Sequence, residues 1–364
     1  MQFQVMSLED NLNLKRIDFF NPLIIVAAIL VFLAMGYIGS FNYRFEDPLN
    51  LEVILTIFFS CLVFAVGAIA VKYKIEIAET KEIDFLSEKI LVALVVIALI
   101  LQGLNLVLIG GIPLFNSVLK SNATTNIWRI AYPLFLIMIN ILLAKHYNRK
   151  YLILVFLGAL IFALNGYRTS VLGILASTFI TLYYLDKISR KLGIIFIAIM
   201  AVAIMAIGYI ASQSIAAQHW TLNPLELVFY RAAFTLKVFE KIIPLAGTAN
   251  GHILSMIFSS GSPRTFIGEY VLHYTVCLTS TLFGPVMLDF GYLGLTIQML
   301  LMGIFLGLMN KLKKGIGVGI YSIILTHTLI WIETGPTDIM IWFLYLLGLI
   351  LIIINFSYIK LNKN

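Results

Sequence analysis

The chain has 364 residues, of which 61% are hydrophobic and only 12% are charged. Apolar runs of about 20 residues recur along it, and in lipid such runs must be helices that satisfy their own backbone hydrogen bonds, which excludes a soluble globular domain. The net charge of +7 would suggest nucleic acid as the partner of a soluble protein, but most of it lies in short loops that set membrane orientation, so no nucleic-acid partner is expected.

Ten apolar segments predict the fold class: an all-α, polytopic membrane protein with about ten transmembrane helices in one domain, residues 1–364. In chain order the segments cover residues 22–40, 51–71, 90–109, 128–144, 151–164, 170–184, 192–211, 283–310, 315–331 and 339–358. The segments 151–164 and 170–184 are short for a hydrocarbon core about 30 Å thick, so they should tilt little or thin the bilayer.

Lysine and arginine are distributed unevenly between the two sides of these segments. About two thirds of the 25 Lys and Arg residues fall on the side that holds both chain ends. The positive-inside rule therefore places both termini in the cytoplasm, and the long connection 212–282 becomes an extracytoplasmic loop. We expect the protein in the cytoplasmic membrane, with its working surface on the outer side.

The outer side is also richer in arginine than the cytoplasmic side, where lysine dominates. Arginine presents a planar fork that binds phosphate oxygens in pairs, whereas lysine is a point charge, so the outer arginines suggest a ligand that carries phosphate. Anchoring at lipid headgroups is the alternative. The spans contain few ionisable residues, which argues against an ion-coupled transporter.

Within the 212–282 loop, Asn223 and Pro224 begin a predicted amphipathic helix over residues 224–243, which Pro244 ends. Its charged residues, Lys237 and Glu240 among them, form a face that we expect to be solvated. Arg231 lies away from that face and should point toward the surface on which the helix packs. It therefore needs an anionic partner, either a carboxylate of the protein or a ligand phosphate.

The remainder of the loop offers candidates for acid–base chemistry. Glu269 and His273 are spaced i, i+4, so a helix would let the carboxylate orient the imidazole as a general base. An ordinary surface pair is the alternative. His252, in a Gly- and Ser-rich stretch, is a further candidate base, and Arg264 is a further candidate cation.

Two short outer connections hold more arginines. The stretch GYRTSVLG (166–173) places Arg168 in a tight turn between two spans, where it could hold a pyrophosphate or could snorkel beside Tyr167. The stretch GGIPLF (110–115) opens the outer connection that leads to Arg129. Cys61 is expected in mid-span and Cys277 in the long loop, so we expect no disulfide between them, and neither cysteine has metal-ligand spacing.

The two stretches just quoted, together with FGPVMLDFGYLG (283–294), resemble the oligosaccharide repeat-unit polymerases of the O-antigen polymerase and ligase superfamily. The resemblance covers about the central two thirds of the chain. It implies a GT-C-like fold, a site facing away from the cytoplasm, no metal and no cofactor. In it, Arg168 matches the arginine of the short outer turn. Asp289 matches the acidic position of the Asp-Phe-Gly stretch and is therefore a further candidate catalytic residue. The spacing of arginine to a glycine eleven positions later, found in some bacterial polymerases, is absent here.

The resemblance suggests transfer of a glycan from a polyprenyl-diphosphate-linked oligosaccharide to the hydroxyl group of another such unit. We expect Arg168 and Arg231, helped by Arg129 or Arg264, to bind the diphosphate. The acceptor hydroxyl would be activated, in order of preference, by His273, Glu269 or His252. A ligase, a glycolipid transporter and a structural membrane subunit are the alternatives, and a chain-length regulator or a flippase is a candidate partner.

Overall fold

The computed structural model describes residues 18–42, 44–77, 86–188, 190–213, 222–259, 261–275 and 277–361. In this part of the chain the helices are α1 (Ile24–Gly39), α2 (Leu51–Lys74), α3 (Glu88–Ile109), α4 (Ser117–Ser121), α5 (Asn126–Lys145), α6 (Tyr151–Ala163), α7 (Arg168–Tyr184), α8 (Arg190–Gln213), α9 (Pro224–Ile242), α10 (His252–Ile257), α11 (Pro263–Leu272), α12 (Gly284–Lys311), α13 (Ile316–Thr334) and α14 (Ile339–Ile354). Short 3-10 turns cover Pro113–Phe115, Ile243–Leu245 and Phe356–Tyr358, and two strands, β1 (Ile75–Ile77) and β2 (Ile359–Leu361), pair antiparallel.

Each of the ten predicted spans coincides with one of these helices. By length and composition, α2, α3, α5, α12, α13 and the part of α8 from Gly193 to Ile210 are long and apolar enough to cross a membrane, while α1, α6 and α14 are shorter apolar helices. The all-α membrane fold is thus confirmed, and the ten-span topology stays a prediction. The predicted loop 212–282 includes residues 214–221, which lie outside the described residues.

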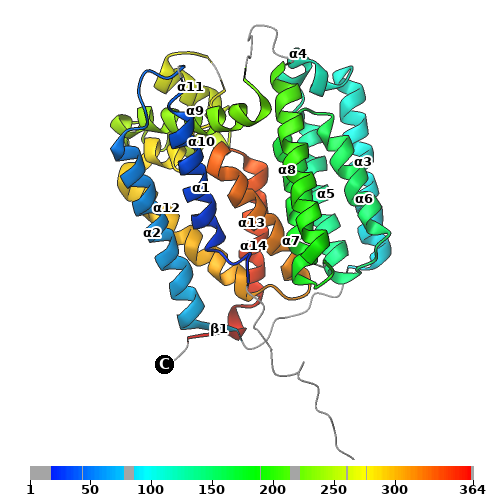
Figure 1. Ribbon diagram of the computed structural model, residues 1–364. Helices are drawn as coiled ribbons and strands as arrows, with labels where there is room; N and C mark the ends of the chain where they lie inside the picture. The colour runs from blue at the N-terminus through cyan, green and yellow to red at the C-terminus, as the bar shows by residue number, and fades with distance from the viewer. Residues whose placement is uncertain are drawn as a thin grey trace, which may run out of the picture.

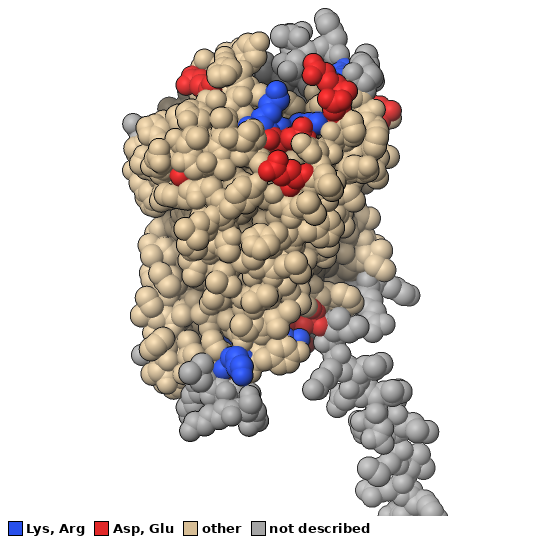
Figure 2. Space-filling model, turned by 90° about the vertical axis from the view of Figure 1, so that its left-hand side faces the viewer, with Lys and Arg blue, Asp and Glu red and all other residues tan. Residues whose placement is uncertain are grey.

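The long helices run side by side, and α9 lies across one end of the bundle together with α10 and α11 (Figure 1). The strands β1 and β2 lie at the opposite end. On the face drawn in Figure 2, acidic and basic side chains gather near the two ends and a broad uncharged band separates them. This distribution is what a bilayer requires of a helical bundle that crosses it.

The start and end of α9 follow from its sequence as predicted. The Asn223 side chain accepts hydrogen bonds from the backbone N–H groups of Leu225 and Glu226, and the Glu226 carboxylate accepts one from the Asn223 N–H in return. This reciprocal capping, with Pro224 in the first turn, satisfies N–H groups that would otherwise lack partners. The helix ends at Ile242, one residue before the predicted boundary.

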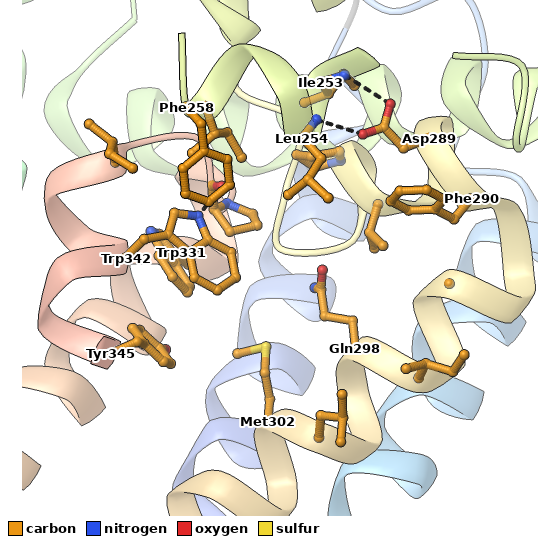
Figure 3. Close-up of a pocket in the computed structure, with 18 of the residues that line it drawn as sticks. Ile253, Leu254, Phe258, Asp289, Phe290, Gln298, Met302, Trp331, Trp342 and Tyr345 are labelled. Carbon is orange, nitrogen blue, oxygen red and sulfur yellow. Dashed lines mark hydrogen bonds between the residues drawn. The ribbon is translucent and has the colours of Figure 1, made fainter. Parts of the chain in front are cut away.

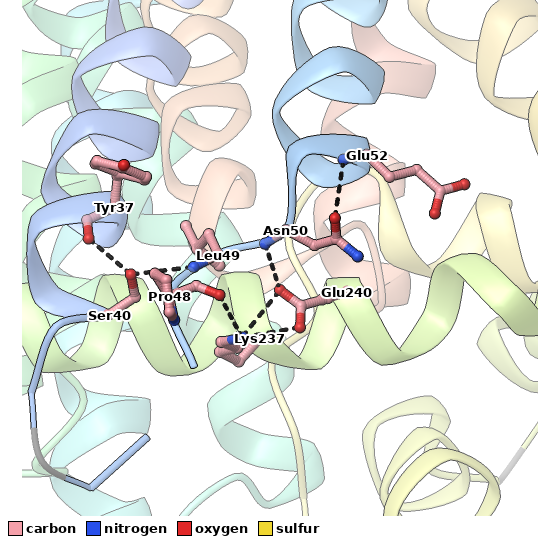
Figure 4. A network of polar contacts seen from close by, with 8 residues as sticks. All are labelled: Tyr37, Ser40, Pro48, Leu49, Asn50, Glu52, Lys237 and Glu240. Carbon is pink, nitrogen blue, oxygen red and sulfur yellow. Dashed lines mark hydrogen bonds and ion pairs between the residues drawn. The ribbon is translucent and has the colours of Figure 1, made fainter. Parts of the chain in front are cut away.

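Only part of the charged face of α9 is solvated as expected: Glu226 and Lys241 are exposed, but Lys237 and Glu240 are packed against the bundle. The side chains of Lys237 and Glu240 are only 15% and 25% exposed. They form an ion pair of 2.8 Å, and Lys237 Nζ donates to the Pro48 carbonyl while Glu240 accepts from the Asn50 N–H (Figure 4). A helical wheel could not reveal this, because the packing partner is the connection between α1 and α2.

Glycines of α1 bring α9 against the bundle. An added Cβ at Gly39 would lie 2.2 Å from the Phe229 carbonyl oxygen of α9. Gly39→Ala is therefore expected to destabilise the protein by about 1–3 kcal/mol, because the backbone of α9 must shift. The melting temperature in detergent measures this effect. Gly103→Ala is the matched control: a Cβ there meets nothing within 4 Å, so an equal loss in both variants would contradict the packing account.

Candidate functional site

Three helices bring two arginines to one carboxylate. Arg168 is the first residue of α7, Arg231 lies within α9, and Glu333 is in the last turn of α13. Arg168 Nη2 forms an ion pair with Glu333 Oε1, and Arg231 Nη2 lies 3.5 Å from the same oxygen. The side chains of Arg168, Arg231 and Glu333 are 22%, 38% and 24% exposed, so the group is partly accessible.

Lys120, on the short helix α4, adds a third positive charge. Its pKa is lowered by burial, and the guanidiniums of Arg231 and Arg168 lower it further. Its ammonium lies 5.6 Å from the ring centroid of Tyr167, whose hydroxyl donates to the Lys120 carbonyl at 2.8 Å. Burial raises the pKa of the Tyr167 hydroxyl above its ordinary value. Lysine and arginines are thus close enough to repel one another.

Arg264, at the start of α11, approaches the same region from another side. Its Nε donates to Thr337 Oγ1 at 3.0 Å, and its charge acts on the Tyr167 hydroxyl, whose pKa it lowers against the effect of burial. We call Lys120, Arg168, Arg231, Arg264 and Glu333 the cationic cluster. With four positive groups and one carboxylate, it can accept a ligand with more than one negative charge.

Glu333 is a residue that sequence reasoning missed. The sequence required either a carboxylate of the protein or a ligand phosphate beside Arg231, and the structure supplies the carboxylate. Arg168, for which snorkelling beside Tyr167 was an alternative, pairs with the same acid. The available signal was an isolated glutamate at the outer end of an apolar segment, a position where ionisable residues are usually paired.

Arg129, by contrast, is exposed in the first turn of α5. Its neighbour Trp128 stacks on Tyr132 with ring centroids 5.4 Å apart. Among the described residues no ion pair holds Arg129, whereas Arg264 acts on Tyr167 within the cluster. The geometry therefore favours Arg264 over Arg129 as the additional cation.

The candidate bases His252 and Glu269 lie on α10 and α11, and His273 follows α11 directly. The helix α11 ends at Leu272, and His273 caps it in the left-handed region with φ 57°. Its N–H donates to the Glu269 carbonyl at 3.1 Å, but in the described part of the chain no hydrogen bond joins the two side chains, which are both exposed. The ring of His252 packs against Phe266, with centroids 4.8 Å apart. The predicted carboxylate–imidazole pair is therefore not formed in this structure.

Asp289 holds the helix α10 in place. Its two carboxylate oxygens accept hydrogen bonds from the backbone N–H groups of Ile253 and Leu254 at 3.0 and 2.8 Å (Figure 3), and the residue is only 3% exposed. An anionic side chain at a helix N-terminus satisfies free N–H groups. Both oxygens of Asp289 are thus engaged in holding α10.

A family model described as "Putative O-antigen polymerase" matches residues 18–345. The chain belongs to the O-antigen polymerase family. Two uncharacterized proteins of Methanocaldococcus jannaschii are similar to it. MJ0419 is 31% identical over 286 residues, 74% of this chain and 77% of that protein. MJ0420 is 32% identical over 276 residues, 74% of this chain and 66% of that protein, slightly under two thirds of its length. No solved structure matches significantly.

For this member of the O-antigen polymerase family, the matched region contains the whole cationic cluster, from Lys120 to Glu333. It also contains the three stretches on which the resemblance of the sequence rested, and with them Arg168 and Asp289. Family membership indicates a glycosyltransferase-like membrane enzyme. The geometry adds the carboxylate that holds the two arginines together.

Proposed function

We propose that this protein polymerises oligosaccharide repeat units linked to polyprenyl diphosphate on the outer face of the cytoplasmic membrane, for a surface polysaccharide. The proposal includes ten membrane spans with both termini in the cytoplasm. It rests on family membership and on one observation: Arg168 and Arg231, from helices far apart in sequence, meet at Glu333. Two guanidinium groups held by one carboxylate form a preorganised binding site for an anion of higher charge, such as a diphosphate.

In the proposed reaction a sugar hydroxyl of one unit attacks the anomeric carbon of another. A glycosidic C–O bond forms, the bond from the anomeric carbon to the diphosphate oxygen breaks, and polyprenyl diphosphate leaves with the bonding electrons. Arg168 and Arg231 would turn from Glu333 to the diphosphate and stabilise the charge that develops on it, with Arg264 and Lys120 beside them. No metal ion takes part in this step.

The hydroxyl proton needs an acceptor within hydrogen-bond reach of the substrate. We propose His273, Glu269 and His252 as candidates, in that order, since they belong to the segment of α10 and α11 that also carries Arg264 of the cluster. Bound glycan could bring a base and a hydroxyl together, because catalytic contacts often tighten only in the complex. Asp289 is proposed as a positioning residue.

The lowered pKa of Lys120 predicts a pH dependence. Its ammonium is lost at a lower pH than usual, so affinity for inorganic pyrophosphate should fall as the pH rises from about 7 to about 10. Lys120→Arg should keep more of its affinity at the upper end, because arginine stays protonated. Calorimetric titration of both proteins across this range measures the effect. Parallel curves for the two proteins would contradict a charged role for Lys120.

Deletion of the gene in its own organism tests the function. Loss of a polymerase should abolish the ladder of glycan lengths and leave lipid linked to a single repeat unit. Loss of a ligase would instead leave long chains on the lipid, and loss of a transporter would leave the lipid-linked unit on the cytoplasmic face. Mass spectrometry of the extracted lipids distinguishes the first two results, and lectin binding to intact vesicles reports the side of the membrane on which the lipid-linked unit lies. Either of the last two would contradict polymerisation.

A further inference from the structure

A large apolar groove lies beneath α10. It has a volume of about 1270 Å³ and is lined by α10, α12, α14 and the end of α13. In Figure 3, three aromatic residues form one wall of the groove: Trp331, Trp342 and Tyr345. Phe290 lies on the opposite side, Leu254 and Phe258 lie at the top, and Met302 lies at the bottom. Pockets for small ligands usually measure about 300–1,000 Å³ and carry several polar groups. This lining suits a hydrocarbon.

The groove opens sideways, where lipid would lie. Leu293 and Leu301 of α12 and Leu346 of α14 line it and are nevertheless 72%, 57% and 48% exposed. From Ile339 to Leu349 along α14 the lining extends about 15 Å into the bundle at 1.5 Å per residue. A chain from the membrane could therefore enter laterally, without passing through an aqueous opening.

The same chain segment forms one wall of the groove and one side of the cationic cluster. Trp331 and Pro336 line the groove, and Glu333 lies between them in sequence. Thr337, next to Pro336, accepts the hydrogen bond from Arg264 Nε. Neighbouring residues of one segment thus contribute to the groove and to the cluster, so an anionic headgroup at the cluster would lie within about one helix diameter, roughly 10 Å, of the groove wall. This juxtaposition fits an amphiphile with several negative charges and a long hydrocarbon chain.

The roof of the groove is built onto a break in α12. Gly291 has φ 63° and ψ −157°, a backbone conformation that glycine alone adopts readily. The carbonyls of Met287 and Leu288, which precede the break, accept hydrogen bonds from the N–H groups of Gly247 and Ala249 at 2.9 and 3.0 Å. Together with the Asp289 cap, these bonds fix α10 over the groove and keep the groove open.

We propose that this groove holds the isoprenoid chain of the lipid-linked glycan, with the units nearest the diphosphate under α10. This inference rests on the proposed function. The stacked rings of Trp331 and Tyr345, with centroids 4.8 Å apart, give the chain a rigid wall, and the Trp342 indole N–H is bonded to the Pro336 carbonyl rather than left unpaired in the groove. Asp289 acts on the reaction by holding the roof, and so by positioning the chain.

Filling the groove tests the inference. Leu301→Trp should raise the KM for a glycan on a full-length polyprenyl diphosphate at least tenfold, because the indole blocks the inner end of the groove. The KM for the same glycan on a two-isoprene diphosphate should stay unchanged, since Leu301 lies ten residues, about 15 Å of helix, beyond the break at Gly291. Leu62→Trp is the matched control, because Leu62 of α2 is 66% exposed and lies outside the groove.

An unchanged KM for the full-length substrate in Leu301→Trp would overturn the inference. Ordinary membrane lipids would then be the occupants of the groove. Failure of the wild-type protein to use either substrate would instead count against the proposed function. A second measurement uses the wild-type protein and therefore does not depend on whether a variant folds. A polyprenyl diphosphate with a photoreactive group on its second isoprene unit should label the groove residues of α10, α12, α13 or α14, and labelling of other helices alone would contradict the placement.

Discussion

Replacing Arg168 or Arg231 with alanine is expected to lower the rate of polyprenyl diphosphate release by about 10²–10³-fold for each arginine. The reason is the shared carboxylate: both guanidiniums meet at Glu333 and are therefore held at one point before the ligand arrives. Lysine should restore little of the rate, because it lacks the planar fork that binds phosphate oxygens in pairs. Release measured with purified protein and lipid-linked repeat units reports the effect.

Arg149→Ala is the matched control for these substitutions. Arg149 is exposed and lies just before α6, whereas Arg168 lies after the end of α6. The two arginines are therefore at opposite ends of the same helix. Its removal takes away the same charge without touching the cluster and should leave the rate unchanged. Retention of normal rates in the Arg168→Ala, Arg231→Ala double variant would show that the cluster does not bind the leaving group.

The second large effect is expected for Glu333→Gln. Removal of one partner from a buried ion pair costs about 3–5 kcal/mol, and partial exposure of these side chains lowers the expected cost to about 1–3 kcal/mol. The variant should therefore melt at a lower temperature. It should also bind polyprenyl diphosphate about tenfold more tightly, because the ligand no longer competes with a carboxylate for Arg168 and Arg231. Melting curves and binding titrations give the two values.

Glu333→Asp provides the comparison, since it keeps the negative charge and should stay close to the wild type in both measurements. The alternative role for Glu333 is that of a general base. In that case Glu333→Gln would abolish turnover while the affinity for polyprenyl diphosphate stayed the same. Weaker binding in the glutamine variant would contradict the account, because it would make the carboxylate a part of the ligand site.

The sequence predicted those parts of the fold that local patterns determine. The apolar segments located the long helices, and Asn223 with Pro224 located the start of α9, because capping depends on neighbouring residues. Arg231 could be assigned to the packed side of that helix by its position relative to Glu226. These predictions needed no knowledge of which helix lies beside which.

Contacts between distant segments could not be predicted in this way. Glu333 is 102 residues from Arg231 and 165 from Arg168 in sequence, and only the bundle brings the three together. The same limit applies to the hydrogen bond from Lys237 to the Pro48 carbonyl, which joins residues 189 positions apart. Asp289 was recognised from its motif, but its role in capping α10 depends on the packing of α10 against α12, because the bonded residues Ile253 and Asp289 are 36 residues apart in sequence.

The most direct test of the central claim is elongation by the purified protein. Lipid linked to a single repeat unit, isolated from the deletion strain, would be incubated with the protein in detergent and a metal chelator, and the products followed by mass spectrometry. We expect products that grow by whole repeat units, with one polyprenyl diphosphate released for each unit added. Unchanged substrate with the wild-type protein, or release of diphosphate without a longer glycan, would contradict the claim that this protein is a polymerase.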